Sequence, residues 1–168
     1  MLSSAGDAEI QAVRETLGGR FGVSEEVLAG WRILSTGPTL WGVREHELLD
    51  DALQVFTVDR TSMPFLRRVG SYWKPTTVVL QLLAPHITRA RVRLTADELD
   101  ALVTDGGLPR TLPGLESGYV AVEGPAGVAG CGLYLEPRPE EDKPEGIILS
   151  QFPRDRWSGF RLSLQEEE

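Results

Sequence analysis

The chain has 168 residues and a formal net charge of −8, from 17 Lys and Arg against 25 Asp and Glu. This length predicts one domain of ordinary size or two small ones. A hydrophobic content of 41% and a charged content of 25% exclude wholesale disorder, and no apolar run approaches the ~20 residues of a membrane helix. With one cysteine and no signal peptide, we expect a cytoplasmic protein without an internal disulfide.

The charge is unevenly distributed along the chain. As a bulk figure, −8 argues against nucleic-acid binding, which usually shows as a basic domain. From Arg60 to Ala96, however, there is no Asp or Glu and there are seven basic residues, so this stretch carries +7 and the remainder −15. A bound polyanion feels only the field within about a Debye length, ~8–10 Å. The stretch is therefore either a solvated face paired with nearby acids or a contact surface for a polyanion.

The first half of the chain predicts helices followed by strands. Apolar spacing indicates a helix over residues 8–17, with Asp7 as its N-cap and two glycines at its end, and Ser24 begins a second helix. Strands, a short helical turn and another strand follow at residues 31–35, 40–44, 47–52 and 54–58. Residues 63–69 favour neither a helix nor a strand. For residues 78–83 a helix, with Pro75 at its first position, is favoured over a strand.

The second half predicts a strand, a helix and then further strands. Residues 90–94 alternate as a half-buried strand does, and Thr95 with Glu98 forms a capping box for a helix that closes at residues 105–107. Three strands follow, at residues 118–123, 128–136 and 147–152. The predicted class is α+β, with a small N-terminal α/β domain before a mixed β barrel or sandwich. The predicted division is residues 1–88, residues 89–163 and a disordered acidic tail at 164–168.

Residues that carry catalysis are scarce. His46 and His86 lack a metal-ligand spacing such as His-x3-His. Cys131 lies between two glycines in a strand pattern, where a small buried residue fits. The glycine-rich run at residues 127–132 continues as strand sequence instead of opening a helix, so it does not predict a phosphate loop. We therefore expect a protein that is not an enzyme and that needs no cofactor and no metal.

Two clusters predict a surface for a polyanion. In a strand over residues 90–94, Arg89, Arg91 and Arg93 would project to one side, spaced by about 6.6 Å, which suits the phosphates of one nucleic-acid strand. Near the C-terminus two arginines lie between two aromatic residues, in the order Phe152, Arg154, Arg156 and Trp157. Aromatic faces stack on unpaired bases and arginines hold phosphates. Phe152 by itself is better explained as a core side chain.

Four segments of the second half follow an order known from one family. They are the strand at 90–94 with the helix after it, and the glycine-bounded strands at 118–122, 127–134 and 146–153. In this order they resemble the PUA domain, a small pseudo-barrel named from pseudouridine synthases and archaeosine transglycosylases. Tyr119 stands where the family usually has Asp, so the match is one of pattern. The resemblance implies a PUA-like mixed β pseudo-barrel that binds RNA.

The resemblance extends over residues 8–161. A small α/β domain that leads into such a barrel is similar to a two-domain ribosome-biogenesis factor of eukaryotes and archaea. It is also similar to the C-terminal extension of Sun-type RNA 5-methylcytosine methyltransferases. Both relatives act on ribosomal RNA, although this chain lacks the methyltransferases' glycine-rich SAM loop and Pro-Cys pair. The resemblance implies a non-catalytic protein that binds rRNA or tRNA, in rRNA processing or modification or in ribosome assembly.

Seven cations are the RNA-binding residues expected on this basis. They are Lys74, Arg89, Arg91, Arg93, Arg154, Arg156 and Arg161. An alternative is a protein–protein adaptor in which the barrel and the apolar residues 78–83 dock an RNA-modifying enzyme or a ribosome-assembly protein. A small-molecule binder or enzyme on a PUA-like fold is a third interpretation, which the scarcity of His, Cys and convergent acids disfavours. No membrane partner is expected.

Overall fold

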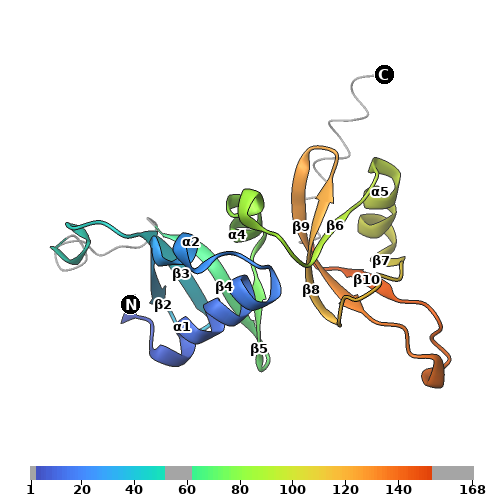
Figure 1. Cartoon of the computed structure of the whole chain (residues 1–168), viewed down its shortest axis with the longest axis horizontal. Helices are drawn as coiled ribbons and strands as arrows, with labels where there is room; N and C mark the ends of the chain where they lie inside the picture. Colours follow the sequence, from blue (N-terminus) through green and yellow to red (C-terminus); the bar gives the residue numbers. More distant parts are fainter. Residues whose placement is uncertain (1–2, 52–61, 153–168) are drawn as a thin grey trace. The chain divides into compact units, whose positions relative to one another are not determined.

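The computed structural model describes residues 3–51 and 62–152. The chain divides into two compact units, Met1–Arg91 and Val92–Glu168, whereas the sequence places a domain boundary between residues 88 and 89. Helices and two five-stranded sheets make up the structure, and the predicted α+β class is confirmed (Figure 1). The strand expected at residues 54–58 and the tail at 164–168 lie outside the described residues.

The N-terminal unit combines helical segments with an antiparallel meander. Its helical elements are α1 (Asp7–Val13), the π-helical η1 (Arg14–Arg20), α2 (Glu25–Ala29), α4 (Thr77–Leu82) and the 3-10 turn η2 (Ala84–His86). Its strands are β1 (Ser3–Ser4), β2 (Trp31–Ser35), β3 (Thr39–Arg44), β4 (Met63–Val69) and β5 (Tyr72–Pro75). They lie side by side in chain order, each antiparallel to the next, so β5 is the last strand of the sheet within the described residues.

A β-bulge explains why β4 is hard to recognise in the sequence. Leu40 of β3 lies opposite Leu66, but the next residue, Trp41, lies opposite Pro64. Phe65 is therefore an extra residue in β4, and the bulge allows the adjacent Phe65 and Leu66 both to be fully buried. Further buried apolar residues of this unit are Val13, Leu17, Phe21, Leu34, Val79, Leu80 and Leu83. Full burial of each large side chain contributes roughly 1.5–3 kcal/mol to folding.

The first helix differs from the prediction at both ends. Its N-cap is Gly6 and not Asp7, because the Glu9 carboxylate accepts the Gly6 N–H at 3.0 Å and the helix begins one residue earlier. The helix also continues beyond the two expected terminal glycines, as η1. The second helix begins as predicted, with the Ser24 hydroxyl accepting the Val27 N–H at 3.4 Å.

The apolar segment after β5 is a helix, α4. Thr76 is its N-cap, and the Thr76 hydroxyl accepts the Val79 N–H at 3.2 Å. Pro75 is the last residue of β5, so the prediction that it occupies the first helical position is wrong: the threonine after it supplies the cap. Val79 and Leu80 on this helix are fully buried.

The C-terminal unit packs one longer helix with a second sheet. Its elements are β6 (Arg91–Arg93), α5 (Ala96–Asp105), β7 (Gly107–Pro109), β8 (Gly118–Gly124), β9 (Gly127–Leu135), the 3-10 turn η3 (Pro139–Glu141) and β10 (Ile147–Ser150). The sheet order is β6-β8-β9-β10-β7. The predicted capping box is present: the Glu98 N–H donates to the Thr95 hydroxyl at 3.2 Å, and the Thr95 N–H donates to the Glu98 carboxylate at 2.8 Å. Gly106, at a φ of 77°, ends α5.

The core of this unit lies along β8, β9 and β10. Its fully buried residues include Leu102, Val120, Val122, Tyr134 and Ile148. Phe152 is also buried, at 9% exposure, and a Cβ atom on Gly130 would lie 2.3 Å from its ring. The close approach of the ring to a glycine of β9 fits the interpretation of Phe152 as a core side chain.

Candidate nucleic-acid interface

Strands β4 and β5 form a hairpin in the stretch of the chain that lacks carboxylates. The register places Arg67 opposite Lys74 and Val69 opposite Tyr72. A two-residue turn closes the hairpin, with Gly70 at a φ of 60° in its first position, the conformation that favours glycine in a type II′ turn. We refer to β4, this turn and β5 as the basic hairpin.

One face of the basic hairpin presents cations beside an exposed aromatic ring. Directly opposite residues of an antiparallel pair share a face, and so do residues two apart in a strand. Arg67, Lys74, Val69 and Tyr72 therefore lie on the same face. The exposed fraction is 73% for Tyr72 and 49% for Val69. Cations next to an exposed ring are the combination that binds the phosphates and bases of a nucleic acid.

The other face of the basic hairpin carries a cation–π contact. Arg68 lies opposite Trp73 in the register. The Arg68 guanidinium carbon is 5.7 Å from the centroid of the Trp73 ring, within the range of a cation–π interaction. One face of the Trp73 ring is thus covered by a cation from the neighbouring strand.

Several arginines elsewhere are paired with carboxylates. The ion pairs are Arg14–Glu25, Arg32–Glu45, Arg93–Glu123, Arg110–Glu98 and Arg138–Glu141. A polyanion that approaches those arginines competes with a carboxylate. In the basic hairpin, two like charges lie directly opposite each other in the register, at Arg67 and Lys74. Like charges in this arrangement destabilise a sheet, and a bound anion would relieve their repulsion.

Arg89 and Arg91, which the sequence places in a basic row, are the last arginines of the N-terminal unit, and both donate to carbonyl groups of that same unit. Arg89 precedes β6, and its Nη2 donates to the Gly18 carbonyl in η1 at 3.1 Å. Arg91 Nη1 donates to the Ala84 carbonyl at 2.9 Å. Arginines commonly satisfy carbonyls near helix ends in this way. Each guanidinium has five N–H donors, so a bond to one carbonyl does not prevent Arg89 or Arg91 from also binding RNA. Their contact with RNA stays a prediction.

The other expected site residues are placed separately. Arg93 lies on β6 with its side chain 81% exposed and pairs with Glu123 at 3.0 Å. Lys74 lies in the basic hairpin, directly opposite Arg67 and on the same face. Arg154, Arg156 and Arg161 lie outside the described residues.

Sequence reasoning missed four residues of the basic hairpin as site residues. They are Arg67, Arg68, Tyr72 and Trp73. The signal that points to them is a run of basic and aromatic residues on both sides of a Gly-Ser turn. It becomes recognisable only when residues 63–69 are read as a strand.

Part of the surface suggested for a protein adaptor, the apolar segment 78–83, is buried, whereas Val78 and Leu82 are half-buried and Gln81 is exposed. Within residues 78–83, the side chains of Val79, Leu80 and Leu83 are 0–3% exposed. These three residues form part of the core of the N-terminal unit. They are therefore unavailable for docking a partner while the unit is folded.

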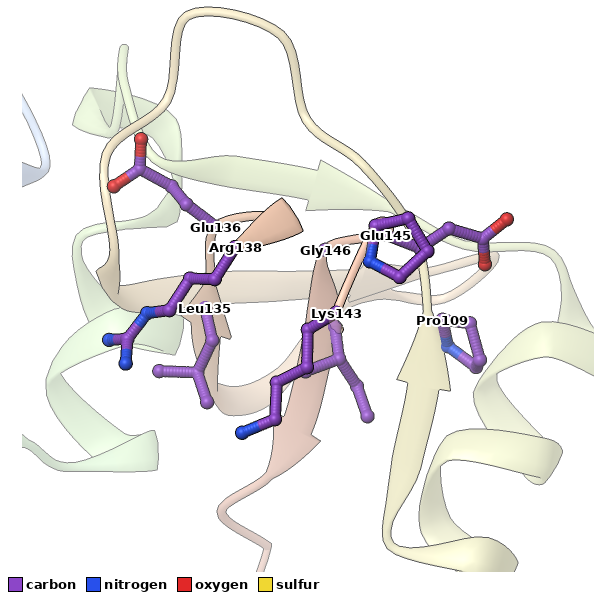
Figure 2. Close-up of a pocket in the computed structure, with 9 residues that line it drawn as sticks. Pro109, Leu135, Glu136, Arg138, Lys143, Glu145 and Gly146 are labelled. Atoms are coloured by element: carbon purple, nitrogen blue, oxygen red, sulfur yellow. The ribbon is translucent and has the colours of Figure 1, made fainter. Parts of the chain in front are cut away.

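The C-terminal unit has an open hollow of about 510 Å³ beside β7, β9 and β10. Figure 2 shows Arg138 and Lys143 extending to the same side of it, while the Glu136 carboxylate is directed away from them. Both cations also lie near Glu141, at 3.3 Å from Arg138 and 3.8 Å from Lys143. A polyanion that approaches these two cations would therefore compete with the Glu141 carboxylate.

Two of the residues considered for catalysis, His46 and Cys131, have contacts that are typical of structural residues. The Nδ1 atom of His46 accepts the Leu48 N–H at 3.1 Å, and the Cys131 side chain is buried in β9. Across residues 3–51 and 62–152, no three His, Cys, Asp or Glu side chains gather as a metal-binding group. The helices of these same ranges are all too short or too polar to cross a membrane.

Comparison with known proteins does not add a family. No family model matches the chain, and no curated protein matches it. The resemblance to the PUA domain therefore rests on the order of segments in the sequence.

Proposed function

We propose that the chain is a non-catalytic RNA-binding protein that acts in rRNA processing or modification or in ribosome assembly. The basic hairpin carries this proposal. Arg67 and Lys74 lie together on one face of this hairpin, in a stretch of sequence without a carboxylate on a chain of net charge −8. Strand arginines and lysines bind phosphates, and the acidity of the rest of the chain disfavours binding elsewhere.

The class of RNA rests on the resemblance to the PUA domain. In this proposal the RNA is ribosomal or transfer RNA, and the protein meets it in the cytoplasm. Further phosphate contacts come from the other expected cations, Arg89, Arg91, Arg93, Arg154, Arg156 and Arg161. Sequencing of RNA crosslinked to the protein in cells would identify the RNA, and recovery of messenger RNA alone would contradict a role on ribosomal or transfer RNA.

The direct test is binding of a fluorescently labelled, unstructured RNA of about 12 nucleotides, measured by anisotropy across a salt series. Each phosphate contact with a single strand contributes about −0.7 to the slope of log K against log salt. Replacing both cations of the exposed face, in Arg67→Ala/Lys74→Ala, should therefore make the slope shallower by about 1.4. If the curves converge near 1 M salt, affinity falls about 25-fold at roughly 0.1 M.

A matched control removes the same two charges elsewhere. Arg138→Ala/Lys143→Ala also deletes one arginine and one lysine, but from a place where both lie near Glu141. This control should bind RNA as the wild type does. An equal loss in both double variants would mean that only total charge matters, and the absence of RNA binding by the wild type at low salt would refute the proposed function.

A further inference from the structure

The exposure of Tyr72 is not explained by the packing of the N-terminal unit. Of the large hydrophobic side chains that are exposed in the described part of the chain, Tyr72 is the most exposed, at 73%. It lies at the end of the basic hairpin, opposite Val69, which is 49% exposed. A ring in this position leaves most of its surface in water, and it contributes little to the core.

The ring lies one step from the two cations on the same face. Lys74 is two residues along β5 from Tyr72, and Arg67 is two residues along β4 from Val69. Two residues in a strand span about 6.6 Å. An aromatic face and two cations at this spacing match a nucleotide, whose base is planar and whose phosphate is anionic.

We propose that the basic hairpin binds single-stranded RNA, with an unpaired base stacked on Tyr72 and the adjacent phosphates held by Arg67 and Lys74. This inference rests on the proposed function and specifies the form of the RNA. In a duplex the bases stack on one another, and proteins contact mainly the backbone and the shallow groove. An exposed ring at a hairpin tip therefore selects unpaired bases.

The surroundings of the two aromatic residues favour Tyr72 over Trp73 as the stacking platform. The Arg68 guanidinium lies over the Trp73 ring on the other face of the hairpin. An acidic peptide could bind Arg67 and Lys74 but would leave the tyrosine ring without a planar partner. A nucleic acid would use both the tyrosine ring and the two cations of this face.

The experiment compares Tyr72→Ala with Tyr72→Phe, which keeps the ring and removes only the hydroxyl. Both are tested by anisotropy against an oligouridylate of about 12 nucleotides, an abasic ribose-phosphate oligomer of equal length and an RNA duplex. Tyr72→Ala should weaken binding of oligouridylate by about five- to 150-fold, and Tyr72→Phe should preserve it. Binding of the abasic oligomer should be the same for all three proteins, and the wild type should bind the duplex more weakly than oligouridylate.

The outcomes separate the stacking inference from the proposed function. If Tyr72→Ala binds oligouridylate as tightly as the wild type, or weakens the abasic oligomer equally, stacking is refuted, while loss of binding in Arg67→Ala/Lys74→Ala still supports RNA binding. Tighter binding of the duplex also refutes the inference. If the wild type binds no RNA, both proposals fail. If it binds an oligoglutamate peptide of equal charge more tightly than oligouridylate, the partner is an acidic protein and both are overturned.

Discussion

Reversing the charge of Arg67 should make the protein more stable and a weaker RNA binder. Arg67 and Lys74 lie directly opposite each other in the β4–β5 register, so the folded hairpin holds two like charges side by side. Arg67→Glu replaces this repulsion with an attraction. Lys74→Glu produces the same change from the other strand, and the double variant Arg67→Glu/Lys74→Glu restores repulsion between two negative charges.

The size of the effect follows from the separation of the two charges. Cross-strand partners have Cβ atoms about 5 Å apart, which places the charged groups roughly 6 Å apart. Two unit charges at about 6 Å in water interact by about 0.7 kcal/mol. Screening reduces this to about 0.6 kcal/mol at 10 mM salt and about 0.3 kcal/mol at 150 mM. Reversing one sign should therefore raise the free energy of unfolding by about 1.1 and about 0.6 kcal/mol, respectively.

Urea unfolding followed by tryptophan fluorescence provides the assay, because urea leaves the ionic strength unchanged. Trp31, Trp41 and Trp73 all belong to the N-terminal unit, so the signal reports strongly on the unit that contains the hairpin. The stabilisation of each single variant should decline toward zero near 1 M salt, where the Debye length is about 3 Å. Strand propensity, which also differs between Arg and Glu, does not depend on salt in this way.

Two results would refute the reasoning. The first is a stabilisation by Arg67→Glu that persists unchanged in high salt. The second is a double variant, Arg67→Glu/Lys74→Glu, that is as stable as either single variant at low salt, since a pairwise interaction must show as non-additivity. Loss of RNA affinity together with a gain in stability would identify the like-charge pair as a binding feature that costs about 1 kcal/mol or less.

Other predictions concern α5 and its cap. Thr95→Ala removes the acceptor of the Glu98 N–H and should lower the free energy of unfolding by about 1 kcal/mol in calorimetry. The Thr95 N–H donates to the Glu98 carboxylate and holds the pKa of Glu98 below its ordinary value of 4.5. The stability that this carboxylate contributes is therefore complete above about pH 4.5, and it is lost as the pH falls through the lower pKa of the folded state. Unfolding measured between pH 7 and about 3 should show less acid destabilisation in Glu98→Gln. Leu102→Ala, at a fully buried position, should cost about 2–5 kcal/mol in the same calorimetric experiment.

The parts of the fold that could be predicted from the sequence are those fixed by local signals. The α5 capping box is encoded within four residues, Thr95 to Glu98, and both of its hydrogen bonds are present. Turn residues and β-branched runs located the strands around Thr39 and Val120 in the same way. Such signals depend on neighbours in the sequence, and no tertiary contact is needed to interpret them.

The candidate site depends instead on pairing between strands. The adjacent apolar residues Phe65 and Leu66 break the alternation of a strand, and only the bulge against β3 places both in the core. That bulge also belongs to the register in which Arg67 lies opposite Lys74. The bond from Arg89 to the Gly18 carbonyl joins residues far apart in the sequence, and the bond from Arg91 to the Ala84 carbonyl requires the chain to bend between them. Hydrophobic periodicity encodes neither feature.

The acidity of the chain contributes to the selectivity of the proposed surface. A net charge of −8 repels polyanions at long range, but this repulsion weakens beyond about 8–10 Å at physiological salt. Arginines such as Arg93 and Arg138 already face carboxylates, so a phosphate gains less by approaching them. At the basic hairpin a phosphate meets two adjacent cations whose mutual repulsion it reduces. RNA should therefore bind at this hairpin, where an added negative charge reduces the repulsion between two cations of the folded protein.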